Sequence, residues 1–245
     1  MLRNGWGTTF FAAIAAICLA APVFAQSLEE LPFSKKLKLA KVGDEDAQMA
    51  VAVAYESGNG AKTDEAEAAK WYRKAALQGN SEAQFRLARI VSKGVKGVKK
   101  DAETAFKLYL DAAGKGHALS QNAVGHAYQN AIGVKADDAK AIEWYRKASE
   151  AKLAVAQNNL GIMYLNGKGI TRNLDEAFKL FKLAADQGDG WGLNNLGGMY
   201  EMGWGAAADK KKAIELYGQA EAKGIAAAGA NRKRLDGAAS TANSQ

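Results

Sequence analysis

The residue types that most often carry enzymatic chemistry are scarce in this chain. Its 245 residues include two histidines, His117 and His126, and a single cysteine, Cys18. Zinc sites in proteins draw their ligands from clusters of His, Cys, Asp and Glu, and neither histidine has a cysteine or a clear acidic cluster beside it. We interpret His117 as a loop residue and His126 as a surface residue of a helix, and we expect no metal site.

The motifs of covalent and phosphoryl-transfer catalysis are also missing. The sequence has no Gly-x-Ser-x-Gly nucleophile turn and no Walker loop. Gly167-Lys168-Gly169 could suggest phosphate binding, but the same Gly-x-Gly turn recurs elsewhere without a lysine, so we interpret it as a repeated structural turn. Carboxylates such as Glu143 and Glu215 lie in charged helix faces, where pairs of acids are common and carry no specific signal. The sequence therefore predicts no catalytic residue and no cofactor.

Basic residues are better candidates, and they point to binding rather than catalysis. The net charge is +7, and three clusters concentrate it. The clusters are Lys93, Lys96, Lys99 and Lys100; Lys210, Lys211 and Lys212; and Arg232, Lys233 and Arg234. Such clusters attract an acidic protein, an anionic lipid headgroup or an anionic envelope polymer, and the alternative is that they only keep the surface solvated. A nucleic-acid partner is not expected, because the N-terminus has the features of an export signal.

Trp191 and Trp204 are the aromatic candidates for a binding surface. Trp204 lies between Gly203 and Gly205 in a predicted turn, and a tryptophan exposed in a turn is a good anchor for a partner. The alternative is that Trp204 packs against the terminal helix. The candidate partner-binding residues are therefore Trp191, Trp204, Lys93, Lys96, Lys99 and Lys100.

The N-terminus resembles a secretory signal peptide. Arg3 precedes an apolar run from Phe10 to Ala21, and Val23 and Ala25 supply the small residues that a signal-peptidase site needs. This run is too short to span a bilayer, which requires about 20 apolar residues. We expect cleavage after Ala25, a periplasmic or secreted mature protein, and no transmembrane segment after cleavage. An uncleaved membrane anchor is the alternative.

A repeat of 36 or 37 residues runs through the rest of the chain. Four columns of similar residues recur in step over five units. The columns are Tyr55, Val91, Tyr128, Tyr164 and Tyr200; Ala68, Ala105, Ala141, Ala177 and Ala213; Tyr72, Tyr109, Tyr145, Phe181 and Tyr217; and Gly79, Gly116, Lys152, Gly188 and Gly224. Such a period is typical of repeat proteins, in which each unit stacks on its neighbours to bury its apolar faces.

Each unit is predicted to contain two helices joined by a glycine turn. In the fourth unit Ala156, Leu160 and Tyr164 fall on one face of a helix. The second helix ends at the fourth column, where glycine suits a left-handed backbone and Lys152 should cost strain. The predicted N-caps of the second helices are Asp64, Asp101, Asp137, Asn173 and Asp209. Small residues that indicate close contact between helices are Ala52, Ala88, Gly125, Gly161 and Gly197.

These features predict an all-α, right-handed solenoid of about five helix pairs with a half-repeat at each end. The last residues are small and polar, a composition that favours disorder at a chain end. The predicted organisation is a signal peptide at 1–25, an N-terminal half-repeat at 26–45, five repeats at 46–225, a C-terminal capping helix at 226–235 and a disordered tail at 236–245.

The units resemble the Sel1-like repeat, a relative of the tetratricopeptide repeat. The resemblance rests on residues 156–164 with the glycine turn at 167–169, and on the second-helix stretch 141–148. It covers roughly residues 46–225. The tetratricopeptide repeat itself has a period of about 34 residues and lacks the Gly-x-Gly turn, so it is the second choice.

This resemblance implies a solenoid whose concave face binds proteins or peptides. Exported members of the family are associated with envelope signalling, assembly and host interaction. A cysteine-rich subgroup has been linked to binding or hydrolysing penicillin-type compounds, but this chain lacks the paired cysteines of that subgroup. We therefore expect an exported, non-catalytic scaffold for a protein or peptide partner. The alternatives are a cell-wall or lactam-directed hydrolase, and an envelope factor that docks on anionic surfaces.

Overall fold

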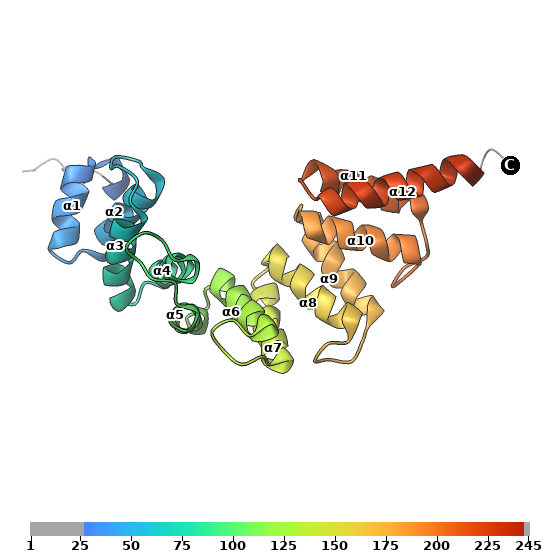
Figure 1. Ribbon diagram of the computed structural model, residues 1–245, viewed down its shortest axis with the longest axis horizontal. Helices are drawn as coiled ribbons and strands as arrows, with labels where there is room; N and C mark the ends of the chain where they lie inside the picture. Colours follow the sequence, from blue (N-terminus) through green and yellow to red (C-terminus); the bar gives the residue numbers. More distant parts are fainter. Residues whose placement is uncertain (1–26, 243–245) are drawn as a thin grey trace, which may run out of the picture.

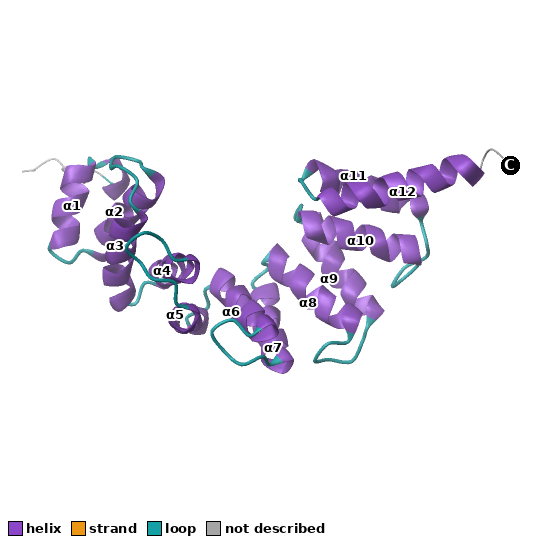
Figure 2. Ribbon diagram, in the orientation of Figure 1, coloured by secondary structure: helices purple, strands orange, loops and turns teal. Residues whose placement is uncertain are grey.

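The computed structural model describes residues 27–242, and the regular structure in this part of the chain is helical (Figure 2). A short 3-10 helix at Leu28–Glu30 precedes the α-helices. These are α1 (Phe33–Lys41), α2 (Glu45–Ser57), α3 (Glu65–Leu77), α4 (Ser81–Lys93), α5 (Ala102–Gly114), α6 (Ala118–Asn130), α7 (Asp138–Glu150), α8 (Ala154–Asn166), α9 (Leu174–Asp186), α10 (Gly190–Met202), α11 (Lys210–Ala222) and α12 (Ala226–Ala242). The only β-pairing within the described residues is an isolated antiparallel bridge between Val95 and Val98.

Five helix pairs form the repeats, from α2–α3 to α10–α11, with α1 before them and α12 after them. Each helix packs on the next one along the chain, so the pairs stack into a solenoid. Figure 1 shows the stack bending into an arc, with α4 and α6 on its inner side and α5 and α7 on its outer side. The predicted all-α solenoid of five helix pairs is confirmed.

The predicted N-caps of the second helices are also confirmed. A side-chain oxygen of each cap residue accepts a hydrogen bond from a backbone amide in the first turn of α3, α5, α7, α9 or α11. The cap residues are Asp64, Asp101, Asp137, Asn173 and Asp209. Each bond satisfies an amide that the helix leaves without a partner and contributes about 1 kcal/mol.

A left-handed residue follows each second helix, as the fourth column predicts. Four of the five are Gly79, Gly116, Gly188 and Gly224, with φ of 105°, 87°, 78° and 87°. The fifth is Lys152, with φ of 62°. A side chain in this conformation crowds the following carbonyl and costs about 1–2 kcal/mol. The strain expected at Lys152 is therefore present.

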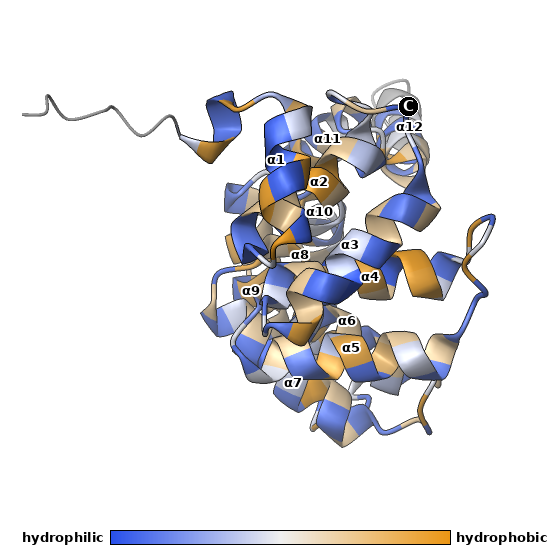
Figure 3. Cartoon of the chain, turned by 90° about the vertical axis from the view of Figure 1, so that its left-hand side faces the viewer, coloured by the Kyte–Doolittle hydropathy of each residue, from blue (hydrophilic) through white to orange (hydrophobic). Residues whose placement is uncertain are grey.

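The core packs an aromatic ring of the second helix against a glycine of the first helix in the same repeat. Tyr145 and Phe181 are fully buried. A Cβ added at Gly125 would lie 2.7 Å from the Tyr145 ring, and one at Gly161 would lie 2.7 Å from the Phe181 ring. These glycines are required for close approach of the rings. Hydrophobic and hydrophilic residues alternate along the helices in Figure 3, as expected for elements that bury one face.

The C-terminal helix is longer than expected from the sequence. At the C-terminal end a capping helix at 226–235 and a disordered tail from residue 236 were predicted, whereas α12 continues to Ala242. Alanine is abundant after residue 236 and has the highest helix propensity, which favours this extension. The predicted signal peptide, 1–25, lies outside the described residues. No helix among residues 27–242 is both long enough and apolar enough to cross a bilayer.

Candidate functional site

Asparagine side chains join the first helices of consecutive repeats directly. Nδ2 of Asn159 in α8 donates to Oδ1 of Asn122 in α6 at 3.0 Å. The same bond recurs between α8 and α10 at 2.8 Å and between α10 and α12 at 3.2 Å. The residues that form these bonds, called here the asparagine ladder, are Asn122, Asn158, Asn159, Asn194, Asn195 and Asn231. The ladder therefore runs along the first helices of the repeats, from α6 through α8 and α10 to α12 (Figure 1).

A row of apolar side chains lies beside the asparagine ladder. Leu119, Val155 and Trp191 are the second residues of α6, α8 and α10, each three residues before a ladder asparagine, so they share its helix face. Leu119 is 42% exposed and Trp191 is 52% exposed. Val155, between them, is half-buried, and an exposed apolar surface of this kind can mark an interaction site. We call these three residues the apolar row, and the ladder and the apolar row together the inner track.

Trp191 and Trp204 do not share a site. They lie at opposite ends of α10, a helix of 13 residues, and so about 20 Å apart along its axis. Trp204 is half-buried and packs on the apolar core around α10, with the guanidinium of Arg172 5.5 Å from its ring centroid. Trp204 therefore packs inward, and Trp191 is the exposed tryptophan of the pair.

The four lysines of the first basic cluster differ in their surroundings. The connection between α4 and α5 turns back on itself, and Nζ of Lys93 pairs with a carboxylate oxygen of Glu65 at 3.1 Å. Lys96, Lys99 and Lys100 are exposed; the hollows beside Lys96 and Lys99 adjoin, since both are lined by Gly97, and Lys100 lines another pocket. Lys93 is therefore engaged in an ion pair, and Lys100 lines a pocket apart from Lys96 and Lys99.

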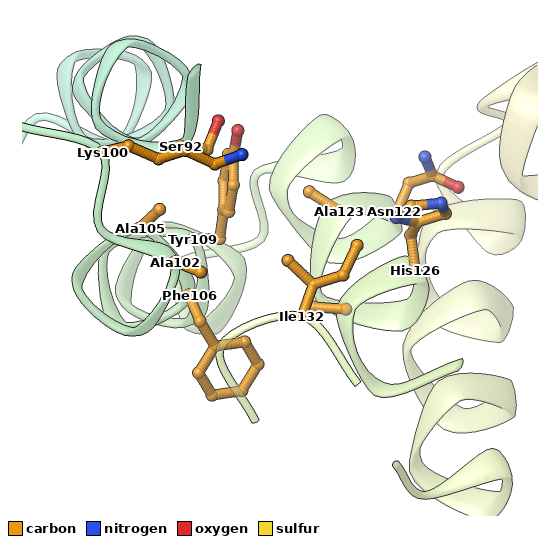
Figure 4. A pocket seen from close by; sticks show the side chains of 11 residues that line it. Ser92, Lys100, Ala102, Ala105, Phe106, Tyr109, Asn122, Ala123, His126 and Ile132 are labelled. Atoms are coloured by element: carbon orange, nitrogen blue, oxygen red, sulfur yellow. The ribbon is translucent and has the colours of Figure 1, made fainter. Parts of the chain in front are cut away.

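A pocket of about 470 Å³ lies between α5 and α6, and Lys100 is part of its wall (Figure 4). The apolar part of the wall includes Phe106 and Ile132. The polar side chains of the wall belong to Ser92, Lys100, Tyr109, Asn122 and His126. No carboxylate lines the pocket, so its polar surface is dominated by groups that can donate hydrogen bonds. His126 is an exposed residue of α6, as expected from the sequence.

One arrangement among the described residues resembles a hydrolytic triad. Ser120 Oγ lies 2.8 Å from His117 Nδ1, and His117 Nε2 lies 3.0 Å from a carboxylate oxygen of Glu82. Ser120 is completely buried, however, and His117 Nδ1 also accepts a hydrogen bond from the Ser120 backbone amide as the N-cap of α6. A nucleophile must reach its substrate and its base must be free to take the proton, so this group is structural.

Within residues 27–242 no three His, Cys, Asp or Glu side chains gather in a way that could hold a metal ion.

A charged network joins the first two repeats on the N-terminal side of the asparagine ladder. Nη1 of Arg86 in α4 donates to a carboxylate oxygen of Glu56 in α2 at 2.8 Å, and the Tyr72 hydroxyl donates to the same oxygen. Burial raises the pKa of the Glu56 carboxyl, but the hydrogen bonds from Tyr72 and Arg86 outweigh it and hold this pKa below its usual range. Burial, followed by the bond to Glu56, raises the pKa of the Tyr72 hydroxyl. The network therefore connects α2, α3 and α4 through side-chain hydrogen bonds.

The asparagine ladder lies outside the columns that the sequence singled out. Its signal is present, since two asparagine columns recur every 36 residues: Asn122, Asn158 and Asn194, and Asn159, Asn195 and Asn231. Recurring polar residues, and not only recurring apolar ones, therefore indicate the positions of the ladder. The spacing alone does not show that one column bonds to the other across repeats.

The repeats and the whole fold have clear relatives. The Sel1 repeat model matches this chain at residues 45–80, 81–117, 118–153, 154–189 and 192–225. A solved structure of a protective antigen present in uropathogenic Escherichia coli strains, described as displaying an SLR fold, is 33% identical with a TM-score of 0.74. That likeness covers 80% of this chain and 42% of the antigen, so the present chain matches less than half of that protein's length.

A second similar structure is a Sel1 repeat protein from Oxalobacter formigenes. It is 27% identical with a TM-score of 0.72, over 80% of this chain and 84% of that one. A Sel1 repeat protein structure from Klebsiella pneumoniae, 22% identical with a TM-score of 0.52 over 84% of this chain and all of its own length, shares the fold. A search among curated proteins found no match. The five consecutive repeat matches show that this chain belongs to the Sel1 repeat family.

Proposed function

We propose that this protein is an exported, non-catalytic scaffold that binds a protein or peptide partner along its inner track. Sel1 repeats mediate protein–protein interaction, which sets the general class of function. The observation that carries the proposal is the combination of paired asparagine amides with the exposed side chains of Leu119 and Trp191 on the same helix faces.

The ladder suits the backbone of an extended partner segment. An asparagine amide offers two donor hydrogens and an oxygen that can accept twice. The bond from Asn159 to Asn122 uses one hydrogen of the first residue and one acceptor site of the second. Asn158 is buried, so the capacity that main-chain amides and carbonyls of a bound segment could use belongs to the half-buried members of the ladder, such as Asn122 and Asn159. Trp191 supplies the large, rigid side chain typical of residues that dominate binding energy.

The triad-like group does not offer a catalytic site for the alternative of a hydrolase. The hydroxyl of Ser120 is sealed from solvent, and His117 is committed to capping α6. A cell-wall or lactam-directed hydrolase therefore gains no support from this arrangement. Docking on anionic surfaces is less well supported, because Lys93 pairs with Glu65 and Lys100 lines a pocket apart from Lys96 and Lys99.

Export rests on the sequence of residues 1–25 and has a direct test. Recovery of the protein from the periplasmic or secreted fraction, followed by N-terminal sequencing, should give Gln26 as the first residue. A chain that keeps residues 1–25 in the membrane fraction would instead identify an uncleaved anchor.

Affinity capture from the envelope fraction tests the scaffold function. The tagged protein is compared with the Trp191→Ala variant and with Leu183→Ala, which removes a 49% exposed apolar side chain from the second helix α9. We expect a partner that is held by the parent and by Leu183→Ala and is lost from Trp191→Ala. Equal loss from both variants, or no specific partner at low and moderate salt, would count against binding through the inner track.

A further inference from the structure

The asparagine ladder stops at the junction between α4 and α6. Its sequence equivalents there are Phe85, 37 residues before Asn122, and Ala123, 36 residues before Asn159. Neither side chain can make the amide–amide bond. The pocket that contains Lys100 opens at this junction and includes Ala123 in its wall. The pocket therefore lies at the end of the inner track, where the asparagine–asparagine hydrogen bonds stop.

The polar groups of this pocket favour an anion. Lys100 makes no ion pair with any described residue, and no carboxylate lines the wall beside it. Oδ1 of Asn122 is occupied by Asn159, and Nδ2 of Asn122 has no hydrogen bond within the described residues. Figure 4 shows the nitrogen of Lys100 and the hydroxyl oxygens of Ser92 and Tyr109 on one side of the pocket. Because the Ser92 hydroxyl donates to the carbonyl oxygen of Arg89 at 2.9 Å, a carboxylate there would meet the Lys100 cation and the hydroxyl of Tyr109 in a partly enclosed space.

The remaining wall is apolar. Phe106 and Ile132 contribute the large side chains, and alanines on α5 and α6 contribute the rest. The volume of about 470 Å³ is at the small end of the usual range for ligand pockets, about 300–1,000 Å³. It suits a chain end with a small apolar side chain better than a bulky headgroup.

We propose that this pocket binds the C-terminal carboxylate of an extended peptide whose last side chain is small and apolar. The preceding residues of the peptide lie along the inner track toward α8 and α10. Asn122 belongs both to the pocket wall and to the ladder, which makes the two surfaces continuous and favours a peptide over a free organic acid. The assignment rests on the proposed scaffold function, because the same inner track carries the rest of the peptide.

The test uses two forms of one labelled peptide. The hexapeptide Gly-Ser-Gly-Ser-Val-Ala carries a fluorophore at its N-terminus and ends either in a free carboxylate or in a carboxamide. Binding to the purified full chain is followed by fluorescence anisotropy. We expect the acid form to bind and the amide form to bind at least about tenfold more weakly, because one charged hydrogen-bonded contact is lost. Equal binding of the two forms, or binding of neither, overturns the proposal.

Two lysine variants locate the effect. Lys100→Met keeps the aliphatic stem and removes the charge, and it should weaken the acid form about tenfold while leaving the amide form unchanged. Lys96→Met is the matched control, since Lys96 is an exposed lysine of the same turn that does not line this pocket. Equal loss in both variants would show general charge attraction and overturn the proposal. Propionate and unlabelled acid peptide are then compared as competitors of the labelled acid peptide. If propionate competes equally well, the ligand is a small organic acid and the peptide assignment is overturned.

The failure of this inference can be told apart from the failure of the scaffold function. A captured partner that is lost from Trp191→Ala and retained by Lys100→Met would support the scaffold and reject the pocket as its end point. If the partner is lost from Lys100→Met, and the carboxamide peptide also binds the parent more weakly than the acid peptide, both the scaffold and the pocket are supported.

Discussion

The hydroxyl of Tyr145 donates a hydrogen bond to Oε1 of Gln129, a residue of the preceding helix, at 2.8 Å. The same pairing recurs in the first and fifth repeats, where the acceptor is a glutamate. In the fourth repeat the equivalent residues are Phe181 and Leu165, so loss of the hydroxyl coincides with loss of the acceptor. The chain therefore contains both a polar and an apolar version of one interhelical contact.

This comparison predicts strong coupling between the two positions. Tyr145→Phe should lower the free energy of unfolding by about 1–3 kcal/mol, because Oε1 of Gln129 is left without its donor in a partly buried place. Adding Gln129→Leu to that variant recreates the Phe181–Leu165 pair and should recover most of the loss. Urea unfolding of both single variants and the double variant measures the coupling. Losses that simply add would contradict it.

The local parts of the fold could be predicted because they depend on residues close together in the chain. Asp64 caps α3 through an amide two residues ahead, and Gly79 ends the same helix with its own backbone. Such contacts leave a direct signature of residue type and spacing, and the 36-residue period multiplies that signature five times. This is why the helix pairs, their caps and their ends agree with the structure.

The parts that could not be predicted depend on contacts between repeats. The bond from Asn195 to Asn158 spans 37 residues and exists only because α8 and α10 lie side by side. Contacts between helices decide that Trp191 is exposed and that Trp204 is half-buried. Residue type and local spacing do not determine these contacts between repeats.

The glycine column makes a second prediction about packing. Gly161→Leu should cost about 1–3 kcal/mol of stability, because its Cβ alone would lie 2.7 Å from the Phe181 ring. Gly198→Leu is the control within the equivalent helix, since a Cβ there meets only the Tyr217 hydroxyl at 3.5 Å. It should be neutral or gain up to about 1 kcal/mol from helix propensity. Thermal or urea unfolding separates the two, and a Gly161→Leu variant as stable as the parent would show that the ring can move aside.

The left-handed residue after α7 gives a prediction in the opposite direction. Lys152→Gly should raise stability by about 0.5–1 kcal/mol, because relief of backbone strain exceeds the entropy that glycine adds to the unfolded chain. The reverse change, Gly116→Lys, should lower stability by about 1 kcal/mol, since a Cβ at Gly116 meets no atom within 4 Å and only the backbone is strained. Urea unfolding of both variants tests this, and changes of the same sign would contradict it.

The network around Glu56 predicts an acid-sensitive contribution to stability. The pKa of this carboxyl is held below its ordinary value of 4.5 in the folded protein, because the hydrogen bonds from Tyr72 and Arg86 outweigh burial. The unfolded chain therefore takes up a proton before the folded one does as the pH falls. The stabilisation is present above the unfolded value and is lost as the pH drops through the folded value.

Glu56→Gln is the variant that isolates this effect. Glutamine accepts the tyrosine hydrogen bond at the equivalent position, Gln129, so the change keeps that contact and removes only the charge that faces Arg86. The variant should be less stable than the parent at pH 7 and should lose less of its stability between about pH 5 and pH 3. Glu103→Gln, which removes an exposed carboxylate from α5, is the control. Urea unfolding across this pH range tests the prediction, and an equal change in pH dependence in both variants would mean that the network between α2, α3 and α4 is not the source.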